Sequence, residues 1–147
     1  MTPPPLADRP ARLFIVDTNV LVAGLLTSRD ASPTARLLDA MLSGSLLFLL
    51  SPELLAEYRA VLLRPRIASA HQLAEAEVDA LLTEITANAI WREPLAAPAM
   101  PPDAGDTHLW ALLACEKNAV LITGDALLLQ NPLPGRLVLR PGDVTAE

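Results

Sequence analysis

The chain has 147 residues, of which 52% are hydrophobic and 19% are charged, and its formal net charge is −6. This apolar composition excludes a disordered chain, and the length suffices for one domain with a buried core. The negative charge argues against tight, non-specific binding to nucleic acid. A bound cation that offsets several acids in one site would weaken that objection.

The single cysteine, Cys115, has no partner for an internal disulfide, which favours a reducing cytoplasm. Residues 1–10 are rich in proline and lack an apolar core segment, so they predict a flexible leader rather than a signal peptide. The longest uncharged stretch, residues 40–52, is too short to cross a membrane. We therefore expect a cytoplasmic protein in which residues 11–147 form a single domain.

Apolar runs and helix-start and helix-stop signals predict an alternation of strands and helices. In chain order these are a strand over 13–16, helices over 19–26 and 33–42, a strand over 46–50, helices over 53–63 and 72–89, a short strand over 90–91, a helix over 106–117, a strand over 119–122, a helical turn over 125–129 and a strand over 137–139. This alternation predicts an α/β fold with a mostly parallel sheet covered by helices on both faces. Such sheets bind ligands outside the carboxyl ends of their strands.

Two predicted strands are followed by a carboxylate at that edge. Asp17 comes directly after the strand over 13–16, and Asp125 follows the strand over 119–122 through Thr123. Each acid could simply cap the helix that comes next. Two strands that deliver acids to the same edge of one sheet favour a site.

Two further acids are expected to reach this edge from helices. Glu57 lies just beside the apolar arc of the helix over 53–63, so its carboxylate can lean toward the sheet. Asp106 has apolar residues at i+3, i+4 and i+7, which places it on the inward face of its first turn. A helix cap is the alternative for Asp106, and Asp103 in the preceding loop competes for the same role. His108 is expected to project away from this face, toward the surface or a partner.

Carboxylates that converge on one edge repel one another unless a cation lies between them. Mg²⁺ and Mn²⁺ prefer such oxygen ligands, and they support phosphodiester hydrolysis by activating water and stabilising charge on phosphate oxygens. His71, His108 and Cys115 lack the spacing of a zinc site. The sequence also has no glycine-rich phosphate loop and no nucleophile elbow.

With these motifs in this order, the chain resembles the PIN-domain ribonucleases over about residues 12–139. The resemblance rests on Val-Asp-Thr-Asn-Val-Leu at 16–21, Ser-Pro-Glu-Leu-Leu-Ala-Glu at 51–57, the segment 103–109, and Leu-Ile-Thr-Gly-Asp at 121–125. In one departure, the segment 102–106 carries fewer acids than the related branch often has there.

The resemblance implies a three-layer α/β/α sandwich and a Mg²⁺ or Mn²⁺ site formed by Asp17, Glu57, Asp106 and Asp125. It also implies that Thr123 and Asn19 support this site by hydrogen bonds. Many members of the family cut single-stranded RNA, and many are dimeric toxins of type II toxin–antitoxin pairs (VapC-like). The expected partners are therefore single-stranded RNA, an antitoxin protein and a second copy of the chain, with no membrane involved.

Basic side chains should surround an acidic pocket that receives RNA phosphates. The candidates are Arg59, Arg64 and Arg66, which follow Glu57, and Arg36 on the earlier helix. The alternative is that each belongs to an ordinary solvated helix face. Aromatic residues make up only 3% of the chain, so base stacking on aromatic rings is not expected to dominate binding.

Other functions remain open at this point. A phosphatase of the haloacid-dehalogenase type also places an aspartate after its first strand, but the second aspartate that it needs two residues later is Asn19 here. A receiver-type phospho-switch needs a lysine after its last strand, and the only lysine is Lys117. A PIN-like module that binds RNA or a partner without cutting is the non-enzymatic alternative.

Overall fold

The protein is described over residues 12–145 of a computed structural model, so the predicted leader lies outside the described residues. Strand β1 (Leu13–Val16) pairs in parallel with β4 (Ala119–Ile122), and β4 pairs in parallel with β5 (Val138–Leu139). Strands β2 (Leu49–Leu50) and β3 (Ile90–Trp91) form a second parallel pair.

An isolated parallel bridge joins the two groups of strands. Phe14 of β1 lies opposite Phe48, and the N–H of Phe14 donates to the carbonyl of Leu47 at 2.9 Å. The strands therefore follow one another in the order β3-β2-β1-β4-β5, all parallel. The chain builds outward from β1 on one side through β2 and β3, and then on the other through β4 and β5. The carboxyl ends of β1 and β4 thus meet where the strand order reverses, which is the position of the ligand crevice in open α/β sheets.

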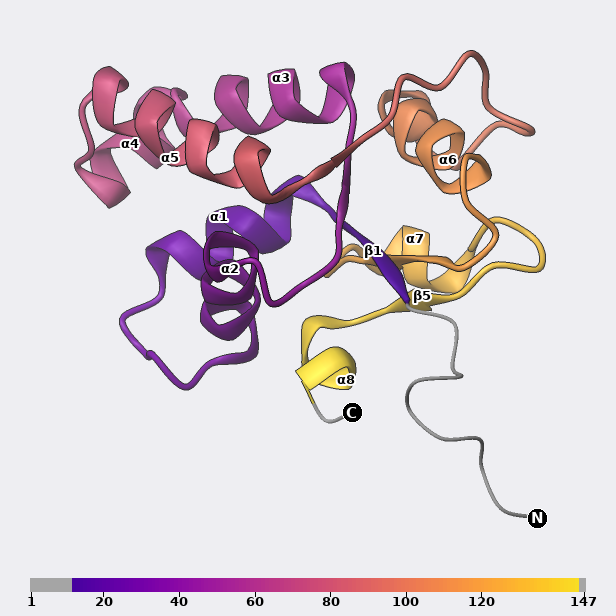
Figure 1. The fold of residues 1–147 in the computed structure, drawn as a ribbon, viewed down its shortest axis with the longest axis horizontal. Coiled ribbons are helices and arrows are strands. Elements are labelled where there is room, and N and C mark those ends of the chain that lie inside the picture. The colour runs from indigo at the N-terminus through magenta and orange to yellow at the C-terminus, as the bar shows by residue number, and fades with distance from the viewer. Residues whose placement is uncertain (1–11, 146–147) are drawn as a thin grey trace.

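Helices cover the sheet and complete a three-layer α/β/α sandwich. They are α1 (Thr18–Leu26), α2 (Pro33–Ser43), α3 (Pro52–Leu62), α4 (Pro65–His71), α5 (Glu75–Asn88), the 3₁₀ turn η2 (Ala104–Asp106), α6 (Thr107–Ala114), α7 (Ala126–Gln130) and α8 (Pro141–Thr145). In the view of Figure 1, α3, α5 and α6 lie above the strands, and α2 and α8 lie below them. No helix within residues 12–145 is long and apolar enough to span a bilayer.

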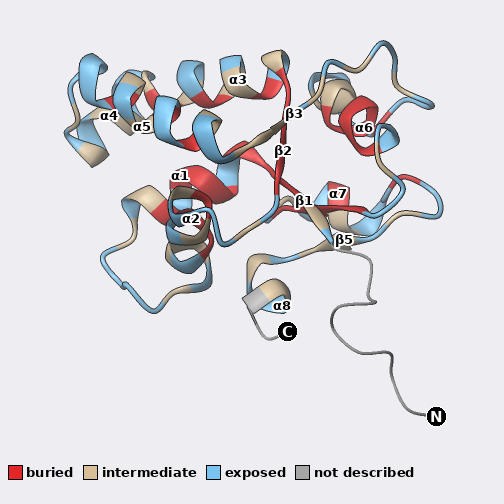
Figure 2. Cartoon of the chain, viewed as in Figure 1, coloured by how far each residue is buried: buried red, intermediate tan, exposed pale blue. Residues whose placement is uncertain are grey.

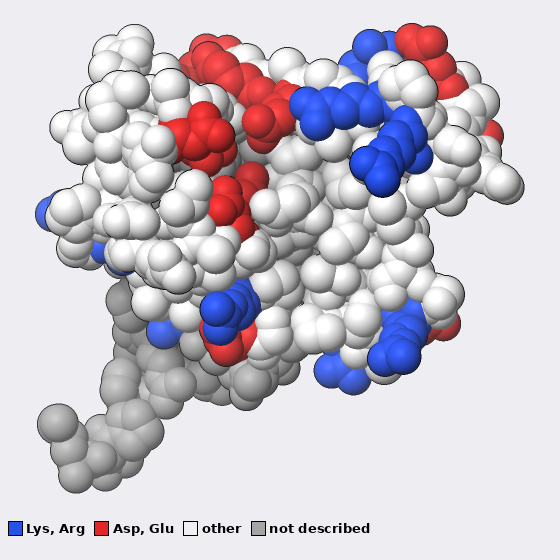
Figure 3. All heavy atoms as spheres, turned by 180° about the vertical axis from the view of Figure 1, so that it is seen from behind, with Lys and Arg blue, Asp and Glu red and all other residues white. Residues whose placement is uncertain are grey.

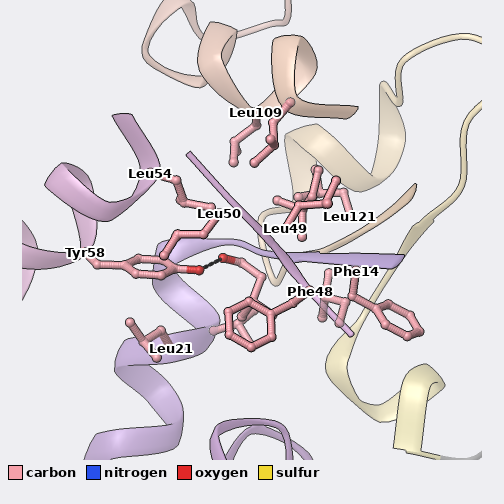
Figure 4. Close-up of a cluster of buried hydrophobic side chains, with 14 of the residues drawn as sticks. Phe14, Leu21, Phe48, Leu49, Leu50, Leu54, Tyr58, Leu109 and Leu121 are labelled. Atoms are coloured by element: carbon pink, nitrogen blue, oxygen red, sulfur yellow. Dashed lines mark hydrogen bonds between the residues drawn. The ribbon is translucent and has the colours of Figure 1, made fainter. Parts of the chain in front are cut away.

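The core lies between these layers, and the helix faces toward it are buried (Figure 2). Tyr58 of α3 is fully buried, and its hydroxyl donates to the carbonyl of Val16 at the end of β1 (Figure 4). This bond fixes α3 against the carboxyl end of β1. It therefore sets the position of the neighbouring residue, Glu57, relative to Asp17.

Most predicted elements are confirmed, with three differences. Helices α4 and α8 were not predicted, because they are short and lack an amphipathic repeat. The helix predicted over 72–89 begins only at Glu75, because Gln72 adopts a left-handed backbone (φ 58°) that ends α4. The strand predicted over 46–50 is shorter in the structure, where β2 covers only Leu49–Leu50. The helix predicted over 106–117 is also shorter, because α6 covers Thr107–Ala114.

Candidate active site

A pocket of about 530 Å³ opens at the carboxyl edge of β1 and β4. Five carboxylates line it, and they belong to Asp17, Glu57, Asp103, Asp106 and Asp125. They come from the end of β1, from α3, from the η2 turn and from the start of α7. Figure 3 shows this concentration of charge, with acidic and basic side chains gathered side by side on one face of the molecule. The structure therefore brings together the four acids that the sequence singled out, with Asp103 beside them.

Asp17 is the most enclosed of these acids, with 5% of its surface exposed. Its Oδ1 accepts from the N–H of Thr18 at 2.8 Å, and its Oδ2 accepts from Thr123 Oγ1 at 2.7 Å and from Asn19 Nδ2 at 3.2 Å. Burial raises the pKa of Asp17, the bonds from Thr123 and Thr18 oppose this rise, and the charges of Glu57 and Asp125 add to it. Three hydrogen bonds thus fix the orientation of the carboxylate, while burial and the nearby negative charges disfavour its ionised form.

Thr123 and Asn19 connect Asp17 to the second strand end. The N–H of Asp125 donates to Thr123 Oγ1 at 3.0 Å, while the N–H of Gly124 donates to Asn19 Oδ1 at 3.3 Å. These bonds hold the loop after β4 against the loop after β1. The geometry agrees with the supporting role that the resemblance implied for both residues.

The capping alternative also holds for the two strand-end acids. Asp17 is the N-cap of α1, and Asp125 is the N-cap of α7 through a bond from the N–H of Leu127 at 2.9 Å. Each cap engages Oδ1, and Oδ2 of Asp17 accepts from Thr123 and Asn19, yet both acids still line the pocket and contribute their charge to it. Capping and a site role therefore coexist at both positions.

Asp106 and Asp103 divide the two roles that the sequence left open between them. Asp103 is exposed, and its Oδ1 accepts from the N–H of Gly105 at 2.8 Å as the cap of the η2 turn. Asp106 makes no side-chain cap bond, although it precedes α6. Burial, followed by the charges of Asp17, Asp103, Asp125 and Glu57, raises the pKa of Asp106 to about 6. Of these two acids, Asp103 uses its carboxylate to cap the local turn, whereas the Asp106 carboxylate makes no cap bond.

Glu57 lies beside two residues whose placement was not foreseen. Its Oε2 accepts from the hydroxyl of Thr18, and its Oε1 lies 3.6 Å from Nε2 of His108. Both ring nitrogens of His108 are buried without a hydrogen-bond partner among the described residues. The expectation that His108 projects away from the site is therefore wrong, because α6 packs against α3 and the His108 ring lies beside the Glu57 carboxylate. The polar triplet Asp-Thr-Asn at 17–19 was the available signal for Thr18.

The four candidate RNA-binding arginines lie in different surroundings. Arg64 lines the acidic pocket, whereas Arg36 and Arg66 are exposed and do not line it. Arg59 is paired with Asp79 at 2.8 Å and with Glu75 at 2.6 Å, both on α5. The guanidinium of Arg59 in turn holds the pKa of Asp79 below its usual range. Of the four, only Arg64 is placed beside the acids.

The donor set fits a hard divalent cation, because the pocket offers carboxylate oxygens and neither sulfur nor a histidine cluster. Within residues 12–145, no three histidine, cysteine, aspartate or glutamate side chains already have the spacing of a metal-ligand group. Burial is the main cause of the raised pKa values of Asp17 and Asp106, and the neighbouring negative charges raise both pKa values further. A cation in the pocket would relieve that repulsion.

The fold and the pocket together define a parallel α/β protein with an acidic site at its strand-order reversal. A family model of the PIN domain matches residues 14–127, and the chain therefore belongs to the PIN-domain family. PIN domains are in general nucleases that use divalent metal ions such as Mg²⁺ or Mn²⁺. A comparison with curated proteins gave no match.

Proposed function

We propose that this protein is a Mg²⁺- or Mn²⁺-dependent endoribonuclease that hydrolyses phosphodiester bonds of single-stranded RNA. One observation carries the proposal: carboxylates from β1, α3, η2 and α7 share a single pocket, where burial, followed by their charges, raises the pKa of Asp106 to about 6. A group of acids held together against its own repulsion fits a cation site better than a structural one.

In this proposal Asp17, Glu57, Asp106 and Asp125 hold the ion, which would supply an activated water and offset charge on the phosphate. The protein's own groups fix these acids in place. Thr123 and Asn19 orient Asp17, Thr18 orients Glu57, and Tyr58 anchors α3 to the end of β1. Asp103, as the cap of the η2 turn, places Asp106 at the pocket.

The phosphatase alternative is disfavoured by the surroundings of Asn19. That chemistry requires an acid at this position to protonate the leaving group, whereas the Asn19 amide donates to Asp17 and accepts from Gly124. An amide in this place ties two loops together and has no proton to transfer as an acid. Its bonds are those of a positioning residue.

The direct test is cleavage of labelled single-stranded RNAs of varied sequence by the purified chain. We expect internal cuts with Mn²⁺ or Mg²⁺, none with EDTA, and a loss of at least about 100-fold in Asp17→Asn. Asp39→Asn, which changes an exposed acid on α2, is the matched control and should cut normally. RNA binding without metal-dependent cutting would instead establish the non-catalytic module, and hydrolysis of small phosphomonoesters but not RNA would establish a phosphatase.

The proposal extends to a role as the toxin of a type II toxin–antitoxin pair, acting as a homodimer. It is supported only by membership of a family in which such toxins are common. Expression of the chain alone should arrest growth, and co-expression of a small neighbouring reading frame should restore it. Growth that is unaffected by the active chain would remove the toxin role and leave the nuclease activity standing. Light scattering of the purified chain tests the dimer.

A further inference from the structure

The acidic pocket has a second, apolar half that the acids do not explain. Its wall consists of Val22, Ala23 and Leu26 from α1, Val61 from α3 and Ile67 from α4, and we call these five residues the aliphatic shelf. Leu26 is 38% exposed, although it is a large hydrophobic side chain. The shelf and the carboxylates share one pocket, so an occupant meets both.

Arg64 borders the same pocket. It stands at the junction of α3 and α4, and within residues 12–145 its guanidinium has no ion pair, unlike that of Arg59. Arginine recognises phosphate through a planar fork of donors. The pocket therefore combines an acidic half, an apolar wall and one guanidinium that makes no ion pair with the described part of the chain.

This combination selects the chemistry of the occupant. A free phosphate makes no favourable contact with an aliphatic wall. An apolar peptide side chain makes no favourable contact with five carboxylates. A nucleotide has an apolar base face close to an anionic phosphate, so it matches both halves once a cation lies between the carboxylates and the phosphate. The volume of about 530 Å³ lies within the range of about 300–1,000 Å³ that small organic ligands occupy.

We infer that the aliphatic shelf binds the base of a nucleotide next to the scissile phosphate, while Arg64 contacts a flanking phosphate of the same strand. The inference rests on the proposed function for the identity of the scissile bond. Because the shelf contacts a base face rather than a base edge, the nucleotide must be unstacked and unpaired. Bases in an RNA duplex are stacked, and its grooves present only their edges. The shelf thus provides a physical reason for a single-strand requirement.

The shelf is tested by comparing two strands of equal length and equal phosphate number, an oligouridylate and a fully abasic strand. Binding is measured by fluorescence anisotropy with Mn²⁺ in the Asp17→Asn background, so that cutting does not interfere. We expect a preference for the strand with bases, and a loss of about three- to tenfold of that preference in Leu26→Ala. Affinity for the abasic strand should not change.

Ile67→Ala provides a second shelf variant on a different helix and should act in the same direction. Leu47→Ala is the matched control, because Leu47 is 45% exposed and does not line the pocket. Melting temperatures confirm that each variant is folded. An unchanged preference in both shelf variants, or no preference in the parent chain, would overturn the inference.

The outcomes also separate the shelf from the catalytic proposal. A base preference that depends on Leu26, without metal-dependent cutting, would refute the nuclease and leave the shelf as part of an RNA-binding module. Cutting that is indifferent to the shelf variants would keep the nuclease and refute the shelf. If Leu26→Ala instead abolished self-association and left RNA affinity intact, the shelf would belong to a contact between two copies of the chain, and the inference would be wrong.

Discussion

Thr123 connects the two acids that follow β1 and β4. Its hydroxyl donates to Asp17 at 2.7 Å and accepts the N–H of Asp125 at 3.0 Å, and the residue is fully buried. Thr123→Val keeps the shape of the side chain and leaves both partners without their bond. We expect a loss of about 1–3 kcal/mol in the free energy of unfolding, measured in urea. Thr123→Ser keeps the hydroxyl and should retain most of this bonding energy, so equal losses in both variants would contradict the argument.

Asp106 gives a pH dependence whose sign follows from its raised pKa. The folded state binds the proton at about pH 6 and the unfolded state near the ordinary value of 3.8, so the folded state is more protonated between them. In EDTA, this residue makes stability fall as the pH rises from about 4 to about 6, and the penalty is constant above that. Asp106→Asn removes the penalty, so its melting temperature should exceed that of the parent increasingly across this interval. An advantage that is the same at every pH would show that ionisation of Asp106 is not its source.

At the scale of elements, α4 places Arg64 at the pocket while α5 holds Arg59 away from it. Arg64→Ala should weaken binding of single-stranded RNA and lower the magnitude of its salt dependence by about 0.7, the slope for one phosphate contact. Arg59→Ala should leave RNA affinity unchanged, because its guanidinium pairs with Asp79 and Glu75. Equal effects of the two substitutions in an anisotropy titration over salt would contradict the assignment of Arg64, rather than Arg59, as the phosphate contact.

At the scale of the whole molecule, a net charge of −6 must be reconciled with an anionic substrate. A cation in the acidic pocket does this locally, and its binding to the folded state should raise the melting temperature. At 100 times the dissociation constant, the gain in stability is about 2.7 kcal/mol. Asp125→Asn should reduce the gain from Mn²⁺, because it removes a charge from the pocket while an amide oxygen can still cap α7. Asp39→Asn should keep the full gain, and an undiminished response in Asp125→Asn would exclude Asp125 as a ligand.

Local signals predicted all five strands, with β2 and β5 shorter than expected, and most helix positions. A short apolar run after a turn is recognisable without neighbours, and so is Ser32 before Pro33 at the start of α2. The short helices α4 and α8 also begin with a proline, but they are too short to show an apolar repeat and depend on their tertiary packing. The partners of Arg59 and the direction of His108 also escaped prediction, because each depends on a residue many positions away in sequence.

The sequence by itself determined the alternation of strands and helices, the acids that follow β1 and β4, and the family to which the chain belongs. These properties are encoded in runs of a few residues, where periodicity and capping act locally. Only the tertiary structure decided that Thr18 and His108 face Glu57, that Arg64 rather than Arg59 borders the acids, and that an aliphatic shelf shares their pocket. Those features arise where the strand order reverses and distant segments pack together, which no local pattern specifies.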